Sequence, residues 1–188
     1  LIQGRTDESI LTETGYEQAA KAGKALSDIY FDKIYSSPLK RAAETAKKIK
    51  ESFKEEQDII FDENLLEVDL GSWSGLTIDE IKKKYPGIYP SWKNNPEELV
   101  LQRSDGNSYK PIQELFNQAH KFIKNIFELY LNKEDVNILI IGHNAILRCL
   151  ILLLIGKPSK GFRKIRLENA SISILNISKH NNSYKTQI

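Results

Sequence analysis

Two places in the sequence put a basic side chain where a predicted strand ends and a helix begins. In the first, residues 36–38 lead into a helix with Arg41 in its first turn, and in the second, residues 142–144 include His143 after an apolar run. The first N–H groups of a helix have no partner within the helix and attract negative charge. The guanidinium of Arg41 adds a planar fork of donors that fits phosphate oxygens. If the two strands are neighbours, both junctions face one phosphate-binding pocket.

A carboxyl group that could serve the same pocket is that of Glu67, in a loop rich in Gly and Trp after a short predicted strand. A carboxylic acid beside a phosphate can protonate the leaving oxygen and then accept a proton from water. Each side chain also has an ordinary structural interpretation. An arginine such as Arg41 is most often a surface ion-pair partner, a loop glutamate is usually solvated, and His143 is equally consistent with a hydrogen-bonded structural residue. None of the three identifies a function alone.

The composition argues against several classes of partner. With 27 Lys and Arg against 25 Asp and Glu, the net charge of +2 predicts no surface for nucleic acid or another polyanion. The apolar run over residues 145–155 contains Arg148 and is too short to span a bilayer, so we expect a buried helix and no membrane partner. The single cysteine, Cys149, excludes an internal disulfide and favours a reducing, cytoplasmic compartment. No cluster of Cys, His or carboxylate residues suggests a metal, and no cofactor is expected.

The elements that must position these residues alternate along the chain. Apolar periodicity predicts helices over about residues 12–27, 37–53, 77–85, 115–130 and 145–155. Short apolar runs predict strands over residues 32–36, 59–61, 136–141 and 171–176, with Asn181-Asn182 turning the last into a hairpin. In the second helix, Ser37 is expected to be the N-cap and Pro38 to lie in the first turn. The alternation predicts an α/β sandwich, in which ligands bind beyond the carboxyl ends of the strands.

Residues 85–109 differ from their surroundings. They contain three prolines, Pro86, Pro90 and Pro96, together with several Asn, Gly and Ser residues. This composition predicts a long loop excursion, and long loops in compact domains are often lids or binding segments. We therefore expect a substrate-facing insertion over residues 85–109.

Four segments, taken in order, resemble motifs of the histidine phosphatase superfamily, in its phosphoglycerate mutase-like branch. They are residues 4–19 with Arg5 near their start, residues 36–46 around Arg41, residues 65–75 with Glu67, and residues 142–144 with His143. The resemblance covers almost the whole chain, and four motifs in the family's order make coincidence improbable.

The resemblance implies a three-layer α/β/α sandwich of the phosphoglycerate mutase-like kind, with residues 1–188 belonging to a single domain. It implies that Arg41 and a protonated His143 bind the phosphoryl group, and that Glu67 acts as the proton donor. Arg5 and Asn144 match further substrate-binding positions of the family's motifs.

Two departures from the family pattern affect the site. The family's nucleophile is a histidine in an Arg-His-Gly motif at the end of its first strand, and this sequence contains no Arg-His-Gly. We therefore expect the domain to be incomplete at its N-terminus, with that strand and the nucleophile upstream of Leu1. The sequence also has Asn107, between Gly106 and Ser108, where many members have Glu. The family's substrate-facing carboxylate is therefore unassigned in this chain.

The function that the resemblance implies is hydrolysis of a small phosphorylated metabolite through a phosphohistidine intermediate. Two alternatives stay open at this stage. A phosphoglycerate mutase could use the same pocket to return the phosphoryl group to a product, although the chain lacks the extended insertions associated with dedicated mutases. A non-catalytic phosphate-binding protein would need no nucleophile at all.

Overall fold

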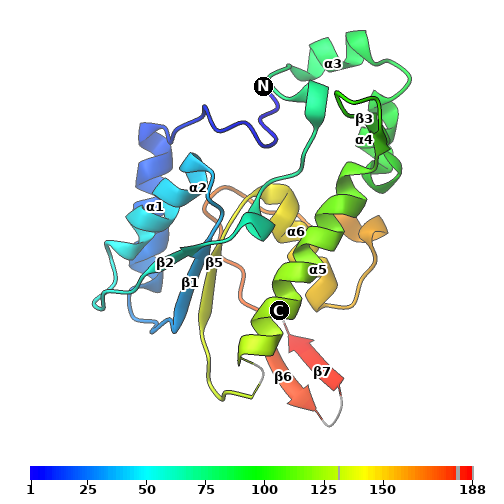
Figure 1. Cartoon of the computed structure of the whole chain (residues 1–188). Coiled ribbons are helices and arrows are strands. Elements are labelled where there is room, and N and C mark those ends of the chain that lie inside the picture. The colour runs from blue at the N-terminus through cyan, green and yellow to red at the C-terminus, as the bar shows by residue number, and fades with distance from the viewer. Residues whose placement is uncertain (131, 181–182, 188) are drawn as a thin grey trace.

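A parallel sheet of three strands lies at the centre of the chain. In the computed structural model, which describes residues 1–130, 132–180 and 183–187, these strands are β1 (Lys33–Ser36), β2 (Ile59–Phe61) and β5 (Ile138–Ile141). Their order across the sheet is β2-β1-β5 (Figure 1). The adjacency of β1 and β5, on which the sequence argument for one pocket depended, is therefore present.

The sheet is covered by helices on both faces. In β1, Ile34 packs into the core on one face and Tyr35 into the core on the other, and their partners on β5 are Leu139 and Ile140. Apolar residues that alternate between two buried faces are typical of parallel strands covered on both sides.

The two helical layers have different origins along the chain. Helices α1 (Glu13–Leu26) and α2 (Lys40–Lys50) cover one face, and α5 (Pro111–Tyr130) and α6 (Asn144–Leu154) cover the other (Figure 1). The predicted three-layer α/β/α sandwich is confirmed. None of the helices in the described parts of the chain has the length and apolar character needed to cross a membrane.

The first helix begins as predicted and the second does not. The Thr12 side chain accepts a hydrogen bond from the Gly15 N–H at 3.1 Å and caps α1. Helix α2 begins at Lys40, later than predicted, because Leu39 keeps an extended backbone and is itself the N-cap. The Ser37 hydroxyl accepts from the Leu39 N–H at 3.3 Å, just before α2, and lies 2.8 Å from the His143 ring.

The predicted excursion over residues 85–109 is more ordered than a loop. It follows α3 (Ile78–Lys84) and contains α4 (Tyr89–Asn94), a 3-10 turn and a short antiparallel pair, β3 (Leu101–Gln102) with β4 (Ser108–Tyr109). Leu99, Leu101 and Tyr109 are buried in the same core cluster as α5 and α6. These buried apolar residues anchor the segment to the core. The segment therefore has regular structure despite its Pro and Gly content.

The C-terminal segment also differs from the prediction. The strand predicted over residues 171–176 is wrong, because Ser171–Leu175 forms no strand and β6 (Asn176–His180) begins where it was expected to end. Strand β6 pairs with β7 (Ser183–Gln187) in a separate antiparallel hairpin. The predicted turn at Asn181-Asn182 lies outside the described residues. Ile172 and Ile174 are 43% and 61% exposed, so this segment has apolar residues with no strand beside them among the described residues.

Candidate active site

The ends of β1 and β5 meet at a buried hydrogen bond. The Ser37 N–H donates to the Ile141 carbonyl at 3.0 Å, which continues the pairing of the two strands by one residue. Beyond this point the Ser37 hydroxyl lies 2.8 Å from His143 Nε2, and both residues are buried. The two strand-to-helix junctions therefore face each other at the carboxyl edge of the sheet.

The surroundings of His143 favour the neutral form of its imidazole. Burial lowers the pKa of His143 to about 3, and the nearby Arg41 charge lowers it further, whereas Asp7 acts in the opposite direction. The family resemblance implies a protonated His143 when the phosphoryl group is bound, and that state stays a prediction. A bound dianion would raise this pKa, since an opposite charge favours the protonated form.

The guanidinium of Arg41 binds the N-terminal segment of the chain. Its two terminal nitrogens donate to the carbonyls of Gly4 and Thr6, both at 2.8 Å. Burial lowers the pKa of Arg41, and the negative charges of Glu67 and Asp7 partly restore it. A guanidinium has five N–H donors, so the group keeps donors for an anion beside these two bonds.

Each helix start at the site is occupied by a carboxylate of the protein itself. At α2, Asp7 Oδ1 accepts from the Lys40 N–H at 2.6 Å, and at α6, Glu67 Oε2 accepts from the Ala145 N–H at 3.2 Å. At least one of the early N–H groups predicted to attract an anion is thus taken by a protein carboxylate at each junction. Unpartnered N–H groups and the helix dipole favour a negative group, and the nearest carboxylates supply it.

The carboxyl group of Glu67 lies at the start of α6 under the loop that carries it. Its other oxygen, Oε1, accepts from the Val68 N–H at 2.8 Å. Burial raises the pKa of Glu67, while the N–H groups of Val68, Ala145 and Ile146 and the charge of Arg41 act against this rise. A glutamate whose pKa is raised spends more time protonated near neutral pH, which is the state that a proton donor requires.

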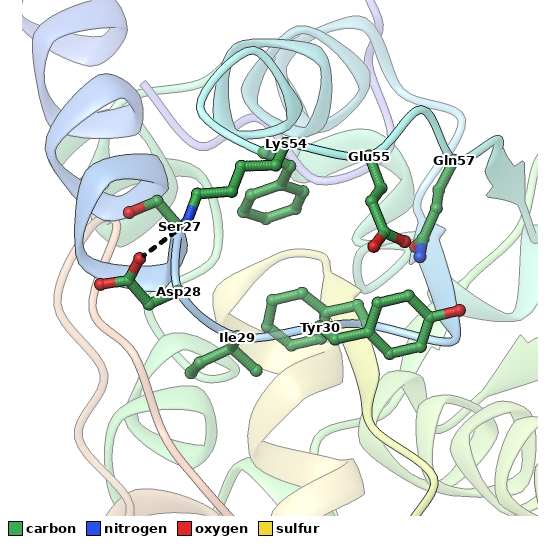
Figure 2. A pocket seen from close by; sticks show the side chains of 9 residues that line it. Ser27, Asp28, Ile29, Tyr30, Lys54, Glu55 and Gln57 are labelled. Atoms are coloured by element: carbon green, nitrogen blue, oxygen red, sulfur yellow. Dashed lines mark ion pairs between the residues drawn. The ribbon is translucent and has the colours of Figure 1, made fainter.

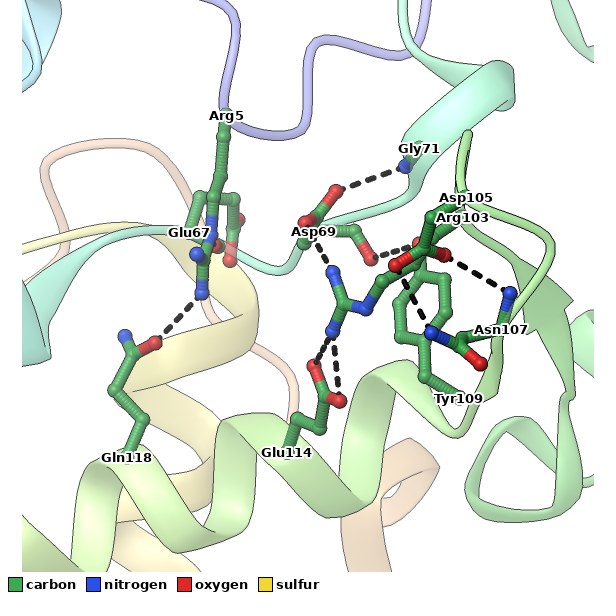
Figure 3. A network of polar contacts seen from close by, with 10 residues as sticks. All are labelled: Arg5, Glu67, Asp69, Gly71, Arg103, Asp105, Asn107, Tyr109, Glu114 and Gln118. Carbon is green, nitrogen blue, oxygen red and sulfur yellow. Dashed lines mark hydrogen bonds and ion pairs between the residues drawn. The ribbon is translucent and has the colours of Figure 1, made fainter.

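Arg5 and Asn144 are bonded to protein groups in this structure. Arg5 donates through Nε to the Glu67 carbonyl at 2.9 Å and through Nη2 to Gln118 Oε1 at 2.7 Å (Figure 3). Asn144 is exposed and donates to the Leu167 carbonyl at 3.0 Å. Arg5 thus supports the backbone of Glu67, and Asn144 connects α6 to the segment that follows the last 3-10 helix.

Three further residues belong to this arrangement, and none of them was assigned to the site from the sequence, where Ser37 was expected only as an N-cap. Ser37 contacts His143, Asp7 occupies the start of α2, and Gln118 holds Arg5. A buried serine at a strand end is a recognisable polar exception, so Ser37 had a signal. Gln118 had none, because a polar residue beside the apolar stripe of a helix is ordinary.

A hollow at the opposite edge of the sheet is not part of this site. It is lined by residues 27–31, by residues 53–55 and by Gln57, and Figure 2 shows Tyr30 and Lys54 among its lining side chains. Residues 27–31 come before β1, whereas the junction with Ser37 and Arg41 comes after it. The length of β1 therefore separates the hollow from the site. In the described parts of the chain, no three His, Cys, Asp or Glu side chains are grouped as a metal would require.

Proteins of similar sequence match this chain over most of its length. The 2-carboxy-D-arabinitol-1-phosphatase of Triticum aestivum is 32% identical over 177 residues, which are 94% of this chain and 34% of that protein. Phosphoserine phosphatase 1 of Hydrogenobacter thermophilus is 28% identical over 96% of this chain and 80% of that protein. The chain thus spans about a third of the length of the plant relative.

A solved structure of similar sequence has the same fold. The structure of YhfR from Bacillus stearothermophilus superposes with a TM-score of 0.84 at 26% identity, covering 100% of this chain and 87% of that one. Residues 1–187 match the family description as one continuous segment. With its sheet order, its paired junctions and this match, the chain belongs to the histidine phosphatase superfamily, branch 1.

Proposed function

We propose that this chain carries the phosphate-binding and proton-transfer groups of a phosphomonoesterase that hydrolyses a small phosphorylated metabolite through a phosphohistidine. The observation that carries the proposal is the meeting of Arg41, Glu67 and His143 at the carboxyl edge of the sheet. The Glu67 charge acts on Arg41, and the Arg41 charge acts on His143, so the three groups share one electrostatic environment. Membership of the histidine phosphatase superfamily supports phosphoryl transfer as the reaction of such an arrangement.

In this mechanism the phosphoryl group lies between Arg41 and His143. Arg41 neutralises the charge of its oxygens, and His143 takes up a proton as the dianion enters. A histidine nitrogen attacks phosphorus while the bond to the leaving oxygen breaks, and Glu67 gives its proton to that oxygen. Water then attacks phosphorus, the bond from phosphorus to histidine nitrogen breaks, and Glu67 takes the proton that water loses.

The attacking histidine would come from a strand upstream of Leu1. Strand β5 pairs with β1 on one side, and among the described residues no strand pairs with it on the other. Ile138, Leu139 and Ile140 are only partly buried, although the strand is apolar throughout. A parallel strand added here would end next to His143, which supports the interpretation of residues 1–188 as one domain without its first strand.

The substrate class follows from the segment over residues 85–109 and from the relatives. The two named relatives act on a phosphorylated sugar acid and on phosphoserine, so we infer a small phosphorylated metabolite for this chain as well. Arg103 and Tyr109, both from this segment, lie near the loop of Glu67 (Figure 3).

The lone buried cysteine, Cys149, fits a cytoplasmic location.

The test is a screen of phosphorylated metabolites with the full-length protein, read as phosphate release, together with acid-labile phosphorylation of the protein during turnover. Release of phosphate with a trapped phosphohistidine supports the proposal. Transfer of the phosphoryl group to a second metabolite, with little release of phosphate, would indicate a mutase. Binding of phosphate esters without either reaction would indicate a binding protein.

A further inference from the structure

We propose that Gln118 of α5 is the positioning residue for proton transfer, because it holds both Arg5 and the backbone that carries Glu67. The inference rests on the proposed role of Glu67 as the proton donor. It means that a residue in the middle of α5, distant in sequence from Glu67, directly influences where the Glu67 carboxyl group lies.

The side-chain amide of Gln118 uses all of its polar groups. Nε2 donates to the Asn64 carbonyl at 3.1 Å and to the Leu66 carbonyl at 2.8 Å, and Oε1 accepts from Arg5 Nη2 at 2.7 Å. An amide has two N–H donors, and here both are directed at the loop that leads into Glu67. Gln118 therefore joins three segments that are distant in sequence.

Arg5 closes this arrangement into a ring of contacts. Its Nε donates to the Glu67 carbonyl at 2.9 Å, while its Nη2 donates to Gln118 (Figure 3). The carbonyls of Leu66 and Glu67 are thus both held, one by Gln118 directly and one through Arg5. Because these carbonyls define the peptide planes on either side of the Glu67 Cα, fixing them also fixes the direction in which its Cα–Cβ bond leaves the backbone.

Helix α5 is a rigid support for this contact. Leu115, Ala119 and Phe122 are each about 1% exposed or less, and they surround Gln118 on the helix. One turn earlier, Glu114 accepts two bonds from Arg103 at 2.7 and 2.6 Å, and Arg103 reaches Asp69 at 3.4 Å (Figure 3).

Two positions on one face of α5 thus hold the loop before and after Glu67. The two contacts are not equivalent. The Arg103 contacts are exposed, and exposed ion pairs stabilise little. The Gln118 contacts are partly buried, and removing that amide would leave two carbonyls and one N–H group of Arg5 without this partner. Gln118 is therefore the contact whose loss should move Glu67.

The experiment compares kcat/KM of the full-length protein on an alkyl phosphate and on 4-nitrophenyl phosphate, because only the alkoxide needs a proton to leave. Gln118→Leu should lose about tenfold to a hundredfold on the alkyl ester, the scale of a misplaced catalytic group, and about threefold or less on the nitrophenyl ester. Gln118→Glu keeps the acceptor for Arg5 but turns a carboxylate toward two carbonyls, so it should show the same selective loss. Gln113→Leu makes the same change at an exposed position of α5 and should be neutral.

Three outcomes separate this inference from the proposed function. Equal loss on both esters for either Gln118 variant, or no loss, overturns the positioning role even if the melting temperature falls. A selective loss by Glu67→Gln alongside such a result leaves the proton donor intact and rejects Gln118 only. If Glu67→Gln itself loses nothing selectively, the proposed function fails, and the inference fails with it.

Discussion

The two strand-to-helix junctions of this molecule are built alike and differ in their surroundings. Both begin a helix after a parallel strand, and in both a carboxylate from another segment accepts from an early N–H of the helix. At α2 the carboxylate is Asp7, on the N-terminal segment, and strand β1 is paired on both sides. At α6 it is Glu67, on a loop held by α5, and strand β5 is paired with β1 alone among the described strands.

The difference assigns separate tasks to the two junctions. At α2, Arg41 and Asp7 are engaged with the N-terminal segment and the helix start, contacts that anchor and bind. At α6, burial moves two pKa values in opposite chemical directions, raising that of Glu67 and lowering that of His143 to about 3. Perturbed pKa values of this kind gather at reactive positions. In the proposed mechanism, Arg41 of the α2 junction and His143 of the α6 junction would bind the phosphate, and Glu67 at the α6 junction would move the proton.

The largest effect should come from the open edge of β5. A protein limited to residues 1–188 should release no measurable phosphate and should lack a cooperative melting transition. In the proposed mechanism the attacking histidine lies outside these residues, and the partly buried residues of β5 have a neighbour on one side only among the described strands. Circular dichroism melting and a phosphate-release assay on the 188-residue protein check this.

The control for this prediction is the protein extended by its upstream residues. The extension should restore both melting and turnover, whereas the same extension with the attacking histidine changed to alanine should restore only melting. Turnover at normal rates by residues 1–188 would place the nucleophile inside this sequence and reject the mechanism.

The second-largest effect should come from Glu67, which we propose as the proton donor, whereas we propose no proton transfer by Asp7. In the full-length protein, Glu67→Gln should lower kcat on an alkyl phosphate about a hundredfold, the usual scale for loss of a general acid. KM should change little, because the amide keeps an acceptor for the Ala145 N–H and leaves Arg41 in place. Steady-state kinetics on the two proteins test this, and a loss confined to KM would argue for a binding role instead.

A smaller effect concerns the proton on His143. The pKa of about 3 in the free site should rise when sulfate binds, so binding should take up a proton as the pH falls from 7.5 to 5. Sulfate does not titrate in this range, and His143→Gln removes only the imidazole contribution. The sulfate affinity of the wild type should therefore rise about tenfold more than that of the variant. Calorimetry in two buffers of different ionisation enthalpy measures the proton directly, and equal pH dependence in both proteins would contradict this.

Much of the architecture could be predicted because its patterns are local. The sequence predicted strands at β1 and β5, and apolar periodicity predicted the first helix over about residues 12–27, close to the observed α1. The meeting of Arg41 with His143 followed once the two strands were taken as neighbours. These inferences needed only periodicity, capping and the geometry of parallel strands.

The features that were missed depend on contacts between distant segments. Asp7 and Glu67 occupy helix starts 33 and 78 residues away from them in sequence, so no local pattern showed that those N–H groups were taken. The strand predicted over residues 171–176 alternates correctly, but pairing requires a neighbour as well as a pattern. Gln118 has its role only because the loop of Glu67 and Arg5 meet over α5.

The smallest effect tests whether the α2 junction is mainly an anchor. Asp7→Asn keeps an acceptor for the Lys40 N–H but removes the charge at the start of α2, so the free energy of unfolding should fall by about 1 kcal/mol. For a chain of this size that corresponds to about 2–4 °C in melting temperature. Activity should stay within about threefold, in contrast to Glu67→Gln, because Asp7 is proposed to anchor and to transfer no proton. Glu8→Gln removes the same charge from the adjacent exposed residue and should leave both measurements unchanged. If Asp7→Asn instead lost activity about a hundredfold at unchanged stability, both junctions would take part in the reaction and the division between them would be wrong.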